Sequence, residues 1–141
     1  RRALHDLRAQ PLEDLGLELA LKQLVDSAIE RADLKAIVDI DSPLHLPPNV
    51  EQVFYRVAQE ALENVVRHAN ATELVFTLHL RDDVLQLIVF DNGQGFEEEA
   101  VEGHYGMQGM RERALTIGAT LSIISHPGEH TQVGLTWERF L

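Results

Sequence analysis

The sequence contains no cysteine in its 141 residues, which excludes disulfides, thiolate metal sites and cysteine nucleophiles. It also lacks an apolar run of the ~18 residues that a membrane-spanning helix needs, and no basic-then-apolar signal segment opens it. The Walker phosphate loop, the G-x-S-x-G elbow and the H-E-x-x-H pair are missing as well. These absences exclude P-loop nucleotidases, elbow-type serine hydrolases and zincins.

Positive charge is scarce. Twelve Lys and Arg residues stand against 23 Asp and Glu residues, which gives a net charge of −11. This charge repels phosphate backbones and anionic lipid, so we expect no nucleic-acid partner and no direct membrane contact. A phosphate-containing ligand would require local N–H groups, a few basic side chains and a cation to overcome it.

Length and composition indicate one globular domain. The chain is long enough to bury one core, and its 45% hydrophobic and 25% charged residues are ordinary globular values. Because the first residue is Arg1 rather than Met, we expect a fragment of a longer chain. We expect this fragment to be cytoplasmic, whether or not its parent is anchored in a membrane.

Hydrophobic periodicity divides the chain into helices and strands. The predicted helices are 12–32, with a break near Gly16, 49–69, with Asn49 as N-cap, and a short helix within 106–118. The predicted strands are 34–40, 74–80, 84–90, 119–126 and 132–138. This order predicts an α+β fold, a two-layer sandwich in which helices cover one face of a mixed sheet. The loop at 91–105 is too long for a plain connector, so the site is expected there.

The helix predicted at 49–69 carries Glu60, Asn64 and His68 at a spacing of four residues. One interpretation is a solvated polar face with a Glu–Arg ion pair. The other is a metal site, in which the side-chain oxygen of Asn64 binds Mg²⁺. Glu60, one turn earlier, would then orient a water or accept a proton.

Two glycine-containing segments flank the long loop. DNGQG at 91–95 is either a hairpin turn or a site where the carboxylate accepts an N–H from a ligand base and the glycines let the backbone approach. GHYGMQG at 103–109 is either a plain hinge or a cradle of backbone N–H groups for an anion. His126 and His130 flank a Pro-Gly pair and share no helix face, so we do not expect them to bind a metal.

Taken together, these segments resemble the ATP-binding domain of sensor histidine kinases, a member of the GHKL superfamily. The resemblance rests on E-x-x-x-N-x-x-R-H at 60–68, DNGQGF at 91–96 and GHYGMQGMRERA at 103–114. RVAQEALENVVRHANA at 56–71 is similar to the branch of nitrate and cell-envelope sensors. The resemblance implies that 12–141 is the ATP-binding catalytic domain and that 1–11 ends a preceding dimerisation hairpin or linker. His5 then belongs to that linker and is structural, not the phosphoacceptor.

The resemblance implies that the ligands are ATP and Mg²⁺. Asn64 matches the residue that binds the Mg²⁺ bridging the phosphates. Glu60 matches the catalytic acidic position one turn earlier. Arg67 and His68 match positions that approach the phosphates.

The base is read by a second group of residues in this family. Asp91 matches the residue that accepts the exocyclic amine of adenine, and Gly93 and Gly95 match the pocket floor. Thr131 resembles the late threonine that supports the adenine end. His130 stands where the family often has the second glycine of G-x-G-T.

The last group of matching residues surrounds the phosphates. Gly103 and Gly106 match residues that flank a lid over them, and Gly109 matches the residue that opens the following helix. The Phe-rich lid motif of many histidine kinases is not recognisable, and this branch commonly lacks it.

The implied function is transfer of the γ-phosphoryl of ATP to a histidine on a separate dimerisation domain, with a response regulator downstream. The alternative is a nucleotide-responsive regulatory module, similar to anti-sigma-factor kinases or to a degenerate kinase. A topoisomerase or chaperone ATPase is disfavoured, because those proteins embed the fold in much longer chains.

Overall fold

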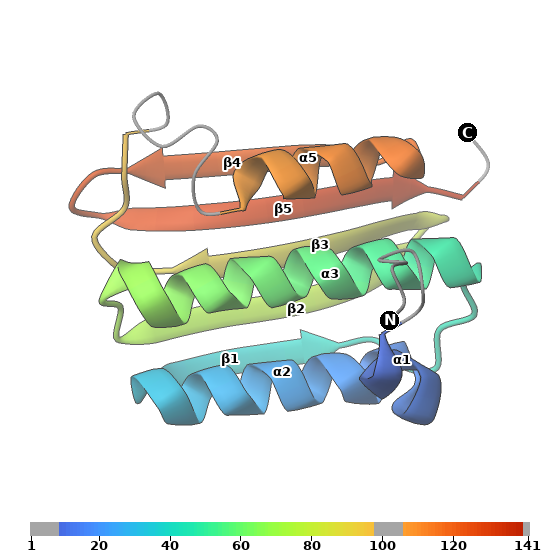
Figure 1. The fold of residues 1–141 in the computed structure, drawn as a ribbon, viewed down its shortest axis with the longest axis horizontal. Helices are drawn as coiled ribbons and strands as arrows, with labels where there is room; N and C mark the ends of the chain where they lie inside the picture. The colour runs from blue at the N-terminus through green and yellow to red at the C-terminus, as the bar shows by residue number, and fades with distance from the viewer. Residues whose placement is uncertain (1–8, 98–105, 140–141) are drawn as a thin grey trace, which may run out of the picture.

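The computed structural model describes residues 9–97 and 106–139 (Figure 1). Its helices are α1 (Gln10–Leu15), α2 (Leu17–Ala32), α3 (Pro48–Asn64) and α5 (Met107–Thr116), and a π turn, η1 (Val65–Ala69), continues α3. Its strands are β1 (Lys35–Ile40), β2 (Glu73–Arg81), β3 (Val84–Asp91), β4 (Thr120–His126) and β5 (His130–Glu138). Every helix and strand predicted from periodicity is present.

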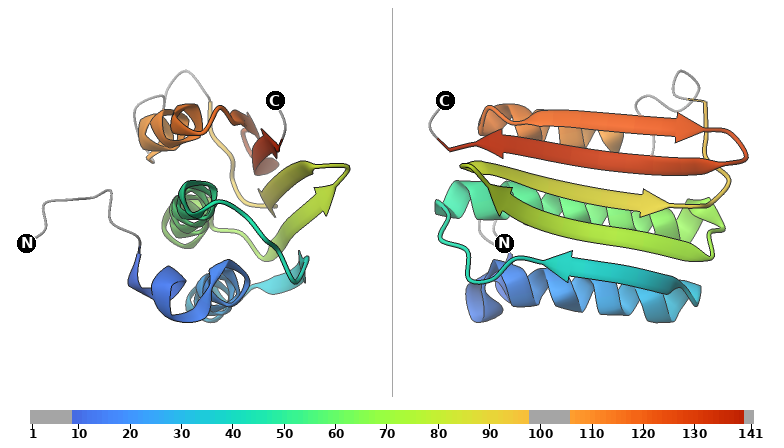
Figure 2. Two further views of the ribbon diagram at one scale, coloured as in Figure 1. Left: turned by 90° about the vertical axis from the view of Figure 1, so that its right-hand side faces the viewer. Right: turned by 180° about the vertical axis from the view of Figure 1, so that it is seen from behind.

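The five strands form one mixed sheet in the order β1-β2-β3-β5-β4. β1 and β2 are parallel because α3 carries the chain back between them, as parallel neighbours require. The pairs β2–β3, β3–β5 and β4–β5 are antiparallel. α2, α3 and α5 lie on one face of this sheet, as Figures 1 and 2 show from three sides. The predicted two-layer sandwich is therefore confirmed.

The core lies between the sheet and its helices. Side chains alternate across a strand, so one set from each strand faces inward, and Phe76, Leu87 and Leu135 are fully buried there. α3 contributes the opposite wall, with eight buried side chains between Val50 and Leu62. Within residues 9–97 and 106–139, no helix is both long and apolar enough to cross a membrane.

Helix ends agree with the sequence predictions at one position and differ at two. Gly16, with φ of 82°, separates α1 from α2 as expected. The prediction that Asn49 is an N-cap was wrong, because Pro47 is the N-cap and Pro48 the first helical residue. Proline suits that place, since its fixed φ is helical and its missing N–H would have no helical partner. α5 begins at Met107, so Gly109 lies inside its first turn and does not open it.

The first described residues are attached to α3. The backbone N–H of Ala9 donates to Oε1 of Gln52 at 3.1 Å. Leu12 of α1 is 1% exposed, so this short helix contributes to the core. Residues 1–8, including His5, lie outside the described residues.

Two leucines of α2 test which face of that helix packs against the core. Leu21 is fully buried, whereas Leu19 is 59% exposed. Leu21→Ala leaves a cavity, and we expect it to lower the free energy of unfolding by about 2–5 kcal/mol. Leu19→Ala is the matched control, with an expected loss below about 0.5 kcal/mol. Urea denaturation measures both, and equal losses would contradict this packing.

Candidate functional site

A pocket opens at one end of the sandwich, where α3 and η1, the end of β3, and the start of α5 converge. Its polar lining consists of Asn64, His68, Asp91, Gln94 and Thr131, and the rest of its wall is largely apolar. We call it the first pocket. Four of these five polar residues belong to the predicted site, and Gln94 is the fifth.

Asp91 is the polar residue buried deepest in this pocket. It is the last residue of β3, and the alternation that turns Leu87 and Val89 inward turns Asp91 inward too. Its side chain is 4% exposed, and it is the one buried polar or charged residue in the described part of the chain. Burial raises the pKa of the Asp91 carboxyl, while the Gly93 N–H and nearby His130 act in the opposite direction. A carboxylate thus occupies a position that the strand pattern assigns to the core.

The segment after Asp91 is held on both sides. On one side, the backbone N–H of Gln94 donates to the Ala69 carbonyl at 2.7 Å, and Nε2 of Gln94 donates to the His68 carbonyl at 2.5 Å. On the other side, the Gln94 carbonyl accepts the N–H of Gly128 at 2.5 Å. Gln94 therefore joins the end of the helix to the β4–β5 turn. No strand returns within residues 92–97, so DNGQG is not the turn of a hairpin.

Gly93 lies where two backbones come closest. The backbone N–H of Gly93 donates to Oδ1 of Asp91 at 2.8 Å. A Cβ at Gly93 would collide with the Ala69 carbonyl oxygen and would lie 2.7 Å from the Ala69 Cβ. Only glycine fits there without movement of η1, which explains the residue type that the motif requires. Gly95 lines the pocket two residues further on.

The π turn brings several pocket residues to one side. Within Val65–Ala69 the helix widens, a deviation found frequently at functional sites. Asn64, His68 and Ala69 all line the first pocket. Asn64 is half-buried and His68 is exposed.

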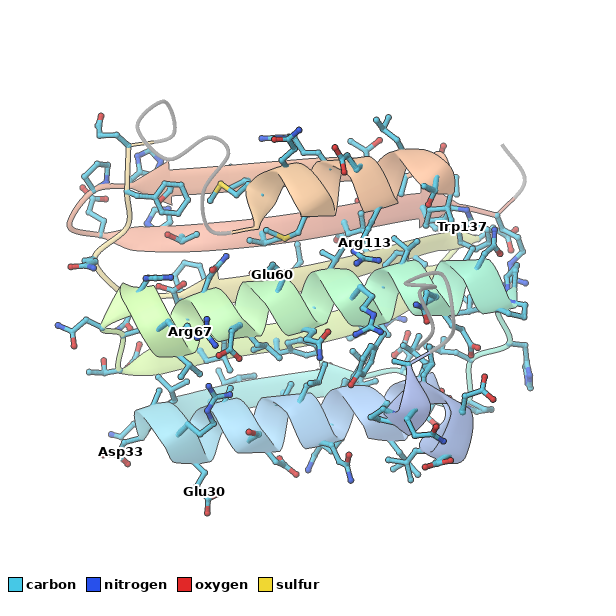
Figure 3. The ribbon with its side chains drawn as sticks, viewed as in Figure 1. Glu30, Asp33, Glu60, Arg67, Arg113 and Trp137 are labelled. Atoms are coloured by element: carbon cyan, nitrogen blue, oxygen red, sulfur yellow. The ribbon has the colours of Figure 1, made fainter. Side chains whose placement is uncertain are left out.

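Arg67 belongs to a different face of the same helix. Its Nε donates to Oε2 of Glu63 at 2.8 Å, and Glu63 also binds Arg31 of α2 at 2.8 Å. The hydrogen bond from Arg31 is the main cause that lowers the pKa of Glu63. Figure 3 shows Arg67 on the side of α3 that faces α2. The helix thus carries a Glu–Arg ion pair on this face, and on an adjacent face about 100° away it carries the polar residues of the first pocket.

Glu60 packs against the start of α5. Gly106 has φ of 71°, and a Cβ there would collide with the Glu60 side chain. Both residues line a second pocket between α3 and α5, together with Gly109. Gly103 lies outside the described residues. The structure therefore brings Glu60, Gly106 and Gly109 together, adjacent to the first pocket.

Thr131 lines the first pocket, and Ser125 contacts it from behind the wall. Thr131 pairs with Asp91 in the sheet and with Ser125 of β4. The two hydroxyls lie 2.8 Å apart, and the Ser125 hydroxyl also accepts the N–H of Phe96 at 2.8 Å. Sequence reasoning missed Ser125 and Gln94. Ser125 could have been found by extending the hairpin register from His126 and His130.

The described fold and this pocket agree with one family of ATPases. The family model described as histidine kinase-, DNA gyrase B- and HSP90-like ATPase matches residues 49–139, and the chain belongs to that family. Among curated proteins it is similar to the sensor protein VraS of Staphylococcus aureus strain COL, at 38% identity over 134 residues. VraS of Staphylococcus haemolyticus is 39% identical over the same length. The match covers 94% of this chain and 38% of each VraS protein.

Solved structures show the same fold. The blue-light-activated histidine kinase EL346 of Erythrobacter litoralis matches with a TM-score of 0.73 and 19% identity, over 87% of this chain and 42% of that one. The Acinetobacter baumannii histidine kinase AdeS matches with a TM-score of 0.70 and 14% identity, over 89% and 64%. Full-length ShkA, solved in complex with AMPPNP, matches with a TM-score of 0.66 and 16% identity, over 83% and 28%.

Two glycines test how closely the DNGQG segment packs against η1. We expect Gly93→Ala to lower the free energy of unfolding by about 1–3 kcal/mol, because the added methyl group forces η1 and the segment apart. In Gly109→Ala the new Cβ meets no heavy atom within 4 Å. This control should instead gain up to about 1 kcal/mol, as alanine does over glycine in a helix. Urea denaturation measures both, and a neutral Gly93→Ala would contradict the close approach.

Proposed function

We propose that this chain binds ATP with Mg²⁺ and holds it for donation of the γ-phosphoryl to a histidine on a separate dimerisation domain. That domain would pass the phosphoryl on to a response regulator, as in two-component signalling. The observation that carries the proposal is the Asp91 carboxylate, buried in the first pocket. Membership of the ATPase family and the similarity to VraS support it.

Asp91 has the chemistry to read adenine. An ionised carboxylate only accepts hydrogen bonds, and the exocyclic amine of adenine donates them. Within the described residues, the Gly93 N–H is the single hydrogen-bond partner of this carboxylate, through Oδ1. A buried carboxylate with an oxygen to spare is costly unless a ligand completes its hydrogen bonding. Gly95 and Thr131 line the largely apolar pocket beside it, and Gly93 acts through its N–H, which donates to Oδ1 of Asp91.

Asn64 has the chemistry to hold Mg²⁺. Its side-chain oxygen is the ligand type that Mg²⁺ prefers, and Mg²⁺ keeps several waters when one or two protein groups bind it. Bound Mg²⁺ would supply neutralisation of the phosphate charge, on which phosphoryl transfer depends. Glu60 lies one turn earlier, and we assign it the orientation of a water or the acceptance of a proton. In a chain with a net charge of −11, the cation also makes triphosphate binding electrostatically feasible.

The remaining predicted residues have secondary roles in the proposal. The first backbone N–H groups of α5, near Gly106 and Gly109, have no helical partners and suit an anion. We assign Gly103 to the same phosphate end. His68 lines the first pocket, whereas Arg67 would have to leave Glu63 to approach a phosphate.

Asp91→Asn tests the reading of adenine. Calorimetric titration with ATP and Mg²⁺ should show binding to the wild type and none to Asp91→Asn, because the amide presents donors where adenine presents donors. Asp33→Asn removes the same charge on an exposed left-handed turn and should bind like the wild type. Unchanged binding by Asp91→Asn would contradict the proposal. Absence of binding to the folded wild type would favour the regulatory module with a degenerate site.

The same variant separates binding from stability. Because burial raises the folded-state pKa of Asp91 above its ordinary value of 3.8, ionising this group costs folding free energy above that pH. Asp91→Asn removes the cost, so its melting temperature at pH 7 should exceed that of the wild type. The difference should vanish as the pH falls below the unfolded-state pKa. A less stable Asp91→Asn would show that the carboxylate stabilises the fold.

Asn64→Ala tests the metal. The variant should retain binding of ADP without Mg²⁺ and lose most of the increase in ATP affinity that Mg²⁺ gives the wild type. Titrations with Mg²⁺ and with EDTA measure that increase. An identical Mg²⁺ effect in Asn64→Ala and the wild type would remove Asn64 from the metal site.

A further inference from the structure

The second pocket lies in the groove between α3 and α5, and its basic groups have no role so far. It is lined by Arg56, Gln59 and Glu60 from α3, and by residues of α5 that include Arg113. Figure 3 shows Glu60 and Arg113 in this groove. Two guanidinium groups and one carboxylate give it a local charge of opposite sign to the chain as a whole.

The guanidinium of Arg56 has hydrogen-bond donors that no described residue uses. Its Nη1 donates to Oε1 of Gln59 at 2.9 Å, and its guanidinium lies 5.9 Å from the centre of the Tyr55 ring. Its Nε is buried and has no hydrogen-bond partner in the described structure. Apart from the Nη1 bond to Gln59, the described residues provide no acceptor for the two outer nitrogens of this guanidinium, so these can donate to an anion in the pocket.

The described residues provide neither arginine with an ion-pair partner. Among residues 9–97 and 106–139, no ion pair engages Arg56 or Arg113. Arg113 is half-buried on α5, whereas Arg56 belongs to α3. The two guanidinium groups therefore reach the same pocket from different helices. Guanidinium groups present several donors in a plane and suit carboxylate or phosphate oxygens.

The two pockets share a wall. Glu60 lines the second pocket and the next residue, Ala61, lines the first. In the same way, Gly106 lines the second pocket and Met107 the first. A ligand with its base at Asp91 that extends past Asn64 therefore reaches the second pocket next. Arg56 lies two helical turns before Asn64, a rise of about 12 Å along α3.

We infer that Arg56 and Arg113 form a second anion subsite, which takes the terminal phosphate of a bound nucleoside triphosphate and so distinguishes it from the diphosphate. This inference rests on the proposed function, because it requires the nucleotide to lie in the first pocket. Shared placement with Glu60 favours a phosphate over a partner's carboxylate, because Mg²⁺ on the triphosphate would offset the repulsion from Glu60.

The test compares triphosphate and diphosphate on the same chain. Calorimetric titrations with AMPPNP and with ADP, both with Mg²⁺, are made on the wild type, Arg56→Gln and Arg113→Gln. We expect each variant to lose about tenfold or more in affinity for AMPPNP and less than about twofold for ADP, as expected for a charged hydrogen bond to phosphate. Arg56→Lys should recover part of the loss, since it retains the charge without the fork.

Arg81→Gln is the matched control. It removes one positive charge from the last residue of β2, which lines neither pocket and pairs with Asp41. Its affinities should equal those of the wild type. Equal losses for AMPPNP and ADP in Arg56→Gln and Arg113→Gln, or no loss for either, would overturn the inference. Unchanged affinities with slower phosphoryl transfer to a separately supplied phosphoacceptor domain would also overturn it, and would assign the groove to domain contact.

The wild-type titration separates this inference from the proposed function. Binding of ADP by the wild type supports the nucleotide pocket by itself, whatever the arginine variants do. If the folded wild type binds neither nucleotide, the proposed function fails and the inference fails with it. Circular dichroism melting of each variant identifies a loss of affinity that comes from unfolding.

Discussion

The pocket depends on the contact between the segment after β3 and the end of the long helix. Gln94 donates two hydrogen bonds to the carbonyls of His68 and Ala69, which lie in the last turn of the helical segment. Carbonyls in that turn have no partners within a helix, so the loop satisfies groups that would otherwise need water. The same contact ties the segment that follows Asp91 to the end of the helical segment that carries Asn64.

A second constraint is the burial of a charge. Asp91 follows the inward alternation of β3 and lies between Leu74 and Thr131 on the neighbouring strands. A leucine there would extend the core, whereas the carboxylate raises the cost of folding and retains one specific acceptor. Stability and recognition are therefore opposed at this residue. A charged residue at a position that the strand pattern assigns to the core is expected at functional sites.

The sequence predicted the fold well because its strands alternate cleanly and its long helix has a broad apolar face. Phe76, Leu87 and Leu135 are buried as their periodicity indicates. Helix ends were less predictable, since Pro48 and Asn49 are both good starting residues and only packing decides between them. For the candidate site, the motifs indicated Asn64, Asp91 and Thr131, which all line one pocket. The contacts of Gln94 join it to residues about 26 positions earlier, and no local pattern encodes them, whereas the pairing of Ser125 with Thr131 follows from the β4–β5 hairpin register.

The attachment of Ala9 to Gln52 has a mechanical consequence. Gln52 lies near the start of α3, and Asn64 is the last residue of this 17-residue helix. A helix of that length is a rod about 25 Å long, and a rod transmits displacement where a loop would absorb it. Ala9 is thus hydrogen-bonded near the start of this rod, and Asn64 at its other end lines the first pocket. A single continuous helix therefore connects the first described residues to a wall of the first pocket.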